Sequence, residues 1–278
     1  MSKQSLPCFP CVPWFNFPGS CRVDQRIGKA LFADNGPLTA ADRRIFSKEI
    51  EEIVCSYVLD ENHGVMLTPS SDAEHDYTCL VQVDVFLKKP GKARRIAELC
   101  HRAMPHPLIV VLHYIETTEY TEGHGKEGNN PCSSVSFRGS KIMFSMAEKR
   151  YSRDGKEQNV LERVVYTEWH TASQLEDSFV KADYAETRAS TFAALHRHYI
   201  ELLEVLNVSD YTGKEPSSRL KVEERRKILE ELHVIDNELA SLKARARQES
   251  ELSRQVELNL KARRLVQHRH ELVGQLES

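Results

Sequence analysis

Hydrophobic positions recur most regularly in residues 218–278, where no Gly or Pro occurs before Gly274. The apolar residues are separated by alternating steps of four and three, which is the a/d pattern of a coiled coil. They are Ile228, Leu232, Ile235, Leu239, Leu242 and Ala246. An amphipathic helix cannot bury its own apolar stripe. The pattern therefore predicts that this helix packs against another copy, another protein or the body of the same chain.

A second apolar series begins at Leu258, and residues 248–253 break the register between the two series. Such a break is compatible with a stutter in one long helix or with the tip of a helical hairpin. Because no Gly or Pro lies in the break, we favour one long helix. The residues expected at its interface are Ile228, Leu232, Ile235, Leu239, Leu242, Leu265 and Leu272.

The remainder of the chain mixes helical and strand patterns. Thr39, with Asp42 three residues later, predicts an N-cap before a helix. Residues 77–87 alternate as a strand, residues 92–104 have a helical apolar face, and residues 108–114 form a buried strand. Residues 141–151 and 160–171 are further strands, and residues 175–206 are helical. This order predicts an α+β fold over residues 22–210, a small mixed sheet with flanking helices, followed by a long C-terminal coiled-coil helix over residues 218–278.

Residues 1–21 have an unusual composition, rich in Pro, Cys and aromatic residues. We expect a disordered leader there, and the sequence leaves open whether it belongs to the native protein. Cys8 and Cys11 have the spacing of a zinc knuckle, but no second pair completes four ligands. We therefore expect no metal site.

Composition restricts the class of protein. The formal net charge is −3, so no overall positive field draws the chain to nucleic acid. No apolar run approaches the ~20 residues of a membrane span, and prolines interrupt the N-terminus where a signal peptide would be apolar. The seven Cys are odd in number and scattered, which suits a reducing compartment. These features predict a cytoplasmic protein with no membrane contact.

Two short motifs are the most specific in the chain: Met-Pro-His-Pro at residues 104–107 and Val-Glu-Leu-Asn at residues 256–259. Shorter matching stretches lie at residues 38–42, 53–59, 81–88, 147–150 and 167–169. Over residues 22–278 they resemble DUF4391, a bacterial and archaeal family of unknown function. The resemblance implies no established activity. It implies a setting among helicase and DNA-methyltransferase genes of restriction-like and phage-defence clusters.

No phosphate-binding loop, dinucleotide fingerprint, nucleophile elbow or zinc-protease motif occurs in the sequence, and we expect no cofactor. The enzymatic hypothesis is a metal-dependent nuclease. Such an enzyme would use Asp84 and Glu148 to hold Mg²⁺ and Lys149 to position water. However, Glu148 and Lys149 are adjacent in a strand and therefore face opposite sides of the sheet.

Basic residues gather around the predicted strand pair and form a candidate phosphate-contacting patch. They are Lys141, Lys149, Arg150, Arg153, Lys156 and Arg163. An ordinary solvated sheet face has the same composition. The function expected from the whole sequence is that of a non-enzymatic accessory protein of a restriction-like or phage-defence system. It would assemble through its C-terminal coiled coil, with another copy or with a partner such as a neighbouring helicase or methyltransferase, and DNA or RNA would be a further ligand. The alternatives are a nuclease-like effector and a purely structural adaptor.

Overall fold

The computed structural model describes residues 15–35, 38–115, 140–151, 159–176, 182–214 and 220–277. The chain divides into two compact units, Met1–Ile200 and Glu201–Ser278. Helix α5 (Phe192–Thr212) contributes its first part to the first unit and its remainder to the second. Each unit is described by itself below.

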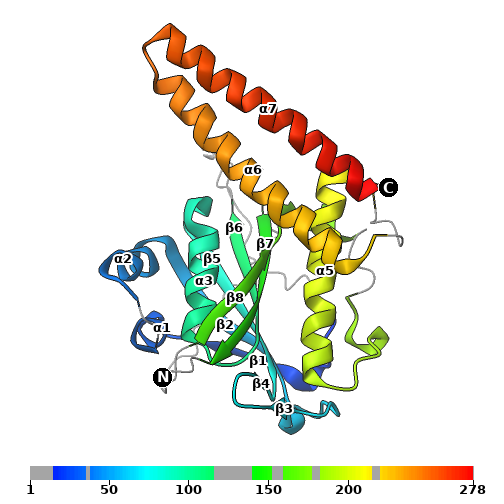
Figure 1. The fold of residues 1–278 in the computed structure, drawn as a ribbon. Helices are drawn as coiled ribbons and strands as arrows, with labels where there is room; N and C mark the ends of the chain where they lie inside the picture. The colour runs from blue at the N-terminus through cyan, green and yellow to red at the C-terminus, as the bar shows by residue number, and fades with distance from the viewer. Residues whose placement is uncertain are drawn as a thin grey trace, which may run out of the picture. The chain divides into compact units, whose positions relative to one another are not determined.

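The first unit is built on a seven-stranded mixed sheet (Figure 1). Its strand order is β1 (Arg22–Arg26), β2 (Ile50–Leu59), β5 (Leu80–Leu87), β6 (Leu108–Ile115), β7 (Ser140–Tyr151) and β8 (Asn159–Tyr166), with β9 (His170–Thr171) also paired to β7. Strands β5 and β6 are parallel, and helix α3 (Ala93–Ala103) connects them. The other pairs of this sheet are antiparallel. The predicted mixed sheet with flanking helices is therefore confirmed.

Short elements complete the first unit. They are the helices α1 (Lys29–Asn35), α2 (Ala40–Glu49) and α4 (Ala172–Glu176), the 3₁₀ turns Gly19–Cys21, Glu61–His63, Pro90–Lys92 and Tyr184–Glu186, and a two-stranded sheet of β3 (Ser70–Ser71) and β4 (Asp76–Tyr77).

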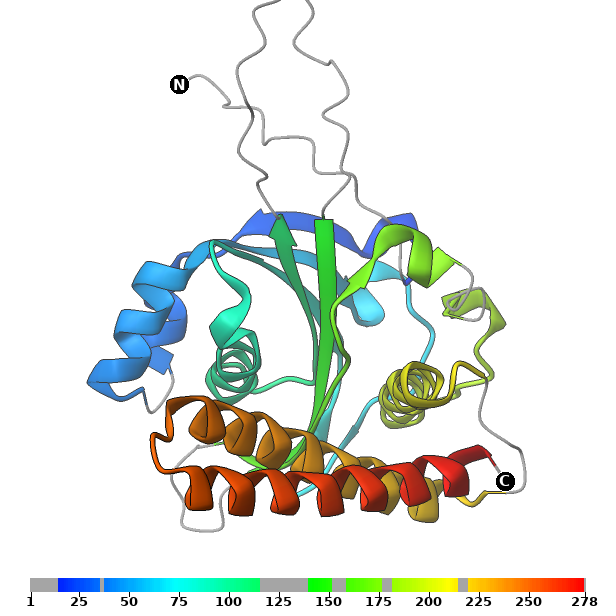
Figure 2. The same cartoon turned by 90° about the horizontal axis from the view of Figure 1, so that it is seen from above.

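The two faces of the sheet are covered differently (Figure 2). Helix α3 lies on one face, where its buried residues Ile96 and Cys100 belong to one apolar cluster with Val83 and Val110. The first part of α5 lies on the other face. This division follows from the alternation of β5, because residues 81, 83, 85 and 87 point towards α3 while residues 82, 84 and 86 point away from it.

Part of the expected leader belongs to the core, which corrects the prediction for residues 15–21. Phe15 is 2% exposed, and its ring lies 5.0 Å from that of Tyr199 and 5.7 Å from that of Phe144. Phe17 and Cys21 are also buried. The four prolines of residues 1–21 favour disorder, but the rings of Phe15 and Phe17 are buried, and burial of aromatic rings stabilises an ordered backbone. Residues 1–14, including Cys8 and Cys11, lie outside the described residues.

The C-terminal stretch is a helical hairpin, so the expectation of one long helix is wrong. Helix α6 (Val222–Gln248) and helix α7 (Leu252–Glu277) are separated by a three-residue turn. The Glu249 carboxylate accepts hydrogen bonds from the backbone N–H groups of Ser250 and Glu251, at 3.0 and 3.1 Å. The Gln255 side chain donates to the Ala246 carbonyl at 3.1 Å. These side chains satisfy the free backbone groups of the helix ends, and the turn therefore needs no Gly or Pro.

The predicted interface residues are buried inside this hairpin. Leu232 is fully buried, and Ile228, Ile235 and Leu239 pack with Leu272 in one cluster. Leu242 belongs to a second cluster, against which Leu265 is partly buried. The apolar stripe of α6 therefore packs against α7 and against the last part of α5, whose Val208 belongs to the first cluster. Of the partners that the pattern allowed, the structure uses the same chain.

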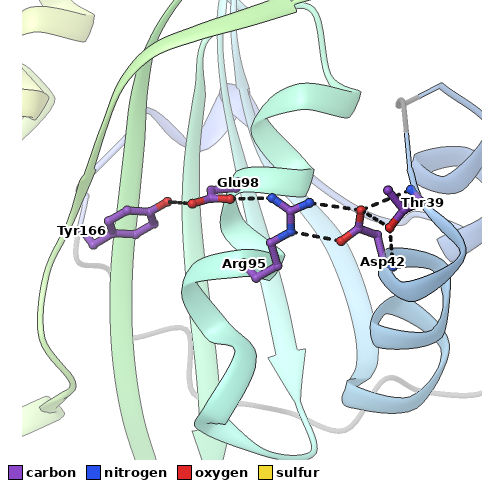
Figure 3. Close-up of polar contacts among 5 residues, drawn as sticks. All are labelled: Thr39, Asp42, Arg95, Glu98 and Tyr166. Atoms are coloured by element: carbon purple, nitrogen blue, oxygen red, sulfur yellow. Dashed lines mark hydrogen bonds and ion pairs between the residues drawn. The ribbon is translucent and has the colours of Figure 1, made fainter. Parts of the chain in front are cut away.

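A polar network joins α2, α3 and β8 (Figure 3). Thr39 and Asp42 form the predicted capping box of α2. Asp42 accepts two hydrogen bonds of 3.0 Å from the Arg95 guanidinium, which also donates to Glu98 at 2.8 Å. Tyr166 donates to Glu98 at 3.3 Å. The matching stretch at residues 38–42 therefore has a structural role, because it fixes the start of α2 and ties that helix to α3.

We expect Asp42→Asn to destabilise the protein at neutral pH by roughly 1 kcal/mol, a figure reduced for screening because Arg95 is 41% exposed. Hydrogen bonds from Arg95 lower the pKa of Asp42 to about 2, from an ordinary value of 3.8. The charged carboxylate therefore stabilises the fold above about pH 4 and ceases to do so as the pH falls towards 2. Urea denaturation at both pH values would measure this, with Glu51→Gln on the exposed face of β2 as the control. An equal loss at pH 7 and pH 2 would contradict the assignment.

Candidate functional site

Strand β5 places two polar side chains on the sheet face opposite α3, and they join a polar cluster made by three neighbouring strands. The Asp84 cluster consists of Ser56 on β2, Gln82 and Asp84 on β5, and His113 on β6. Asp84 pairs with Val54 on one side and with Val111 on the other, so it lies in the middle of the sheet. His113 lies near the carboxyl end of β6. Open α/β sheets commonly bind ligands beyond the carboxyl ends of parallel strands.

The other three polar groups converge on the Asp84 carboxylate. His113 Nε2 lies 2.6 Å from Asp84 Oδ1, and Gln82 Nε2 donates to Oδ2 at 3.0 Å. The Ser56 hydroxyl donates to the same oxygen, Oδ2. On its other side, the His113 ring stacks on Phe86, with centroids 4.7 Å apart and planes inclined by 16°. The side chains of Asp84 and His113 are 13% and 21% exposed.

The carboxylate of this cluster is held in its charged form. Burial alone would raise the pKa of Asp84, but the hydrogen bonds from His113, Ser56 and Gln82 outweigh burial and lower it. An ionised carboxylate only accepts hydrogen bonds, so His113 carries a proton on Nε2. A carboxylate that fixes one ring nitrogen leaves the other available as a base or ligand. Among the described residues, no group of three His, Cys, Asp or Glu side chains is arranged to hold a metal ion.

The structure does not bring together the three residues of the nuclease hypothesis. Asp84 lies beside Val111, which is opposite Phe144 on β7, and Glu148 is four residues further along β7. With ~4.8 Å between strands and ~3.3 Å per residue, Asp84 and Glu148 are roughly 15 Å apart. Glu148 instead forms an ion pair with Arg163 on β8, at 2.9 Å.

Lys149 is buried at the end of α3. Its amine donates to the carbonyl oxygens of His101 at 3.4 Å and Met104 at 2.7 Å, and also to that of His106. These carbonyls belong to the last turn of α3 and the Met-Pro-His-Pro motif, which stops the helix. Burial lowers the pKa of Lys149 to about 7, whereas the three carbonyl acceptors favour the protonated amine. Lys149 therefore closes the C-terminal end of α3 and is not placed to contact a phosphate.

The remaining residues of the predicted basic patch are interleaved with acids where they are described. Arg150 pairs with Glu162 at 3.0 Å, and Arg163 pairs with Glu148. Lys141 lies on β7, opposite Thr171. Arg153 and Lys156 lie outside the described residues. Much of the positive charge expected on this strand pair is thus matched by neighbouring carboxylates.

The family model of the domain of unknown function DUF4391 matches residues 15–268. The chain belongs to this family. No curated protein and no solved structure matches the chain. The DUF4391 match begins at Phe15, the first of the leader residues that pack in the core, and it includes most of α7.

Helix α7 of this DUF4391 protein carries a second apolar face, which the sequence analysis did not identify. The exposed stripe consists of Leu252, Val256, Leu260 and Val266, which are 72%, 49%, 50% and 51% exposed. At 100° per residue these four lie within about 120° of the helix surface, and the face packed against α6 is on the opposite side. The signal was the four-residue spacing of 252, 256 and 260, which the stronger seam obscured. No helix among the described residues is long and apolar enough to cross a bilayer.

Proposed function

We propose that this DUF4391 protein is a non-enzymatic accessory protein that binds a partner protein through the exposed stripe of α7. The observation that carries the proposal is the stripe itself, because contiguous exposed apolar residues on one helix face are typical of protein interaction sites. Three of them follow the i, i+4, i+8 spacing with which a helix inserts side chains into a groove.

The hairpin supports this use of α7. Its own seam is filled by Leu232, Leu239 and Leu272, so the helix is folded before a partner arrives. A preorganised helix loses little conformational entropy on binding. The partner that the family resemblance suggests is a helicase or DNA methyltransferase of a restriction-like or phage-defence system, acting with this protein in the cytoplasm. We commit to an apolar groove of such an enzyme as the occupant of the stripe.

The alternative is a metal-dependent nuclease-like effector. It is favoured by the Asp84 cluster, in which a charged carboxylate orients His113 near the carboxyl ends of two parallel strands. However, Glu148 and Lys149 are engaged with other groups, as described above. The accessory role is therefore the better supported of the two.

The triple variant Leu252→Asp, Val256→Asp and Leu260→Asp is expected to weaken partner binding by about 100-fold or more, because three apolar contacts are lost and three charges would be desolvated. Co-expression with the neighbouring helicase and methyltransferase, followed by affinity measurement on the purified complex, tests this. The folded chain should survive, since all three positions are exposed.

The matched control is Ser241→Asp, Ala244→Asp and Gln248→Asp, which adds the same charge at exposed positions of α6. It should bind the partner as the parent does. Equal binding by the stripe variant and the parent would overturn the proposal. A parent that forms dimers, with the stripe variant monomeric and neither enzyme bound, would instead assign the stripe to a second copy of this chain.

A further inference from the structure

Exposed lysines gather at the carboxyl end of β5, between the strand and the helix that the sequence predicts over residues 77–87 and 92–104. Lys88 and Lys89 follow β5 directly, and Lys92 closes the 3₁₀ turn that leads into α3. All three are exposed. Lys29, at the start of α1, reaches the same place. We refer to Lys29, Lys88, Lys89 and Lys92 as the lysine edge.

Backbone contacts fix the position of these side chains. Lys29 Nζ donates to the carbonyl of Ile50, the first residue of β2, at 2.5 Å. The backbone N–H of Lys88 donates to the carbonyl of Glu49, which directly precedes β2, at 2.8 Å. Ile50 is paired with Leu87 in the β2–β5 ladder. The segments that carry Lys29 and Lys88 therefore meet at one corner of the sheet, although they are far apart in the sequence.

The positive charges of Lys29 and Lys88 lie close enough to influence each other. Partial burial lowers the pKa of Lys29, and the like charge of Lys88 lowers it further. Glu51 acts in the opposite direction. Arg26 also faces this corner but is paired with Glu52 at 2.6 Å. Lys88, Lys89 and Lys92 have no ion-pair partner among the residues that the structure describes.

The contrast with the strand pair β7–β8 decides where an anion would bind. There, Arg150 and Arg163 are matched by carboxylates, whereas Lys88, Lys89 and Lys92 of the lysine edge are exposed. The start of α3 adds to the attraction, because its first turn contains no acidic residue and the helix dipole is positive at that end. Lysines that lack paired carboxylates, as Lys88, Lys89 and Lys92 do among the described residues, attract a ligand that brings several negative charges at regular spacing.

We propose that the lysine edge is a nucleic-acid-binding surface that contacts the phosphodiester backbone of DNA. Lysine side chains that contact phosphate groups do not distinguish one base from another, so binding is independent of the DNA sequence. A lipid surface fits less well, because Leu31 is the one large exposed hydrophobic residue on α1 and membrane-binding helices need a continuous apolar face. The inference goes beyond the proposed partner binding and uses a different unit of the chain.

The test is fluorescence anisotropy of a labelled DNA duplex with the full chain over a range of salt concentrations. Four lysine contacts predict a slope of log affinity against log salt of about −3 to −4. Lys88→Glu, Lys89→Glu and Lys92→Glu together should reduce that slope by about three and weaken binding at low salt at least ~10-fold. The charge-conserving variant with Arg at all three positions should bind as the parent does.

The matched control reverses the same number of charges at exposed positions of the hairpin, Lys243→Glu, Arg247→Glu and Arg263→Glu. It should leave binding nearly unchanged, and an equal loss would show that only net charge matters. If Arg153→Glu with Lys156→Glu abolishes binding while the edge variant binds normally, the β7–β8 patch is the site and the inference fails. Binding to phosphatidylserine vesicles without binding to DNA would also overturn it. None of these measurements involves the partner protein, so they can fail independently of the proposed function.

Discussion

Replacing Leu232 by Asp is expected to unfold the C-terminal hairpin and not to separate two subunits. Leu232 is fully buried in the cluster that joins α6, α7 and the last part of α5. Truncating such a leucine to Ala costs about 2–5 kcal/mol, and an unpaired charge at the same position costs more. Helices α6 and α7 would lose the seam that holds them together.

Circular dichroism and urea denaturation of the full chain measure this effect. The control is Val234→Asp on the same helix, which is 63% exposed and should change stability by less than about 0.5 kcal/mol. If the stripe instead formed an intermolecular coiled coil, the Leu232 variant would remain helical and its particle mass by light scattering would decrease. That result would contradict the intramolecular seam.

Replacing Asp84 by Ala is expected to lower the free energy of unfolding by about 3 kcal/mol at neutral pH, because His113, Ser56 and Gln82 all lose their acceptor. The pKa of Asp84 is lowered in the folded state despite burial, so this stabilisation is present above the ordinary value of 3.8 and is lost as the pH falls below it. Denaturation at pH 7 and near pH 3 would show a larger difference between variant and parent at the higher pH.

The control for Asp84 is Glu168→Ala, which removes an exposed ion pair with Arg94 and should cost less than about 1 kcal/mol. The same site separates the two functional hypotheses. We expect no cleavage of DNA or RNA by the parent with Mg²⁺ or Mn²⁺. Cleavage that disappears in the shape-conserving variants Asp84→Asn and His113→Gln would favour the nuclease over the accessory protein.

The sequence by itself determined the helices and strands whose alternation of apolar and polar residues shows which face is buried. The Thr39–Asp42 capping box forms as predicted, because both partners lie within one helical turn. The alternation of residues 80–87 yields a strand with one apolar face, and the a/d stripe of α6 is buried as its spacing requires. These features depend on contacts between near neighbours or on a requirement for burial that any partner can satisfy.

The tertiary structure decided which partner satisfies each requirement. Nothing in the spacing of the α6 stripe distinguishes a second chain from α7, and the turn at residues 249–251 uses a glutamate side chain in place of Gly or Pro. The sequence predicts Lys149 as a phosphate ligand, whereas the register of β7 places its amine at the end of α3. The Asp84 cluster contains residues from three strands, and the lysine edge contains residues from α1 and from the segment after β5. Such groups are separated by long stretches of chain, so their meeting depends on strand order and register, which local pattern does not encode.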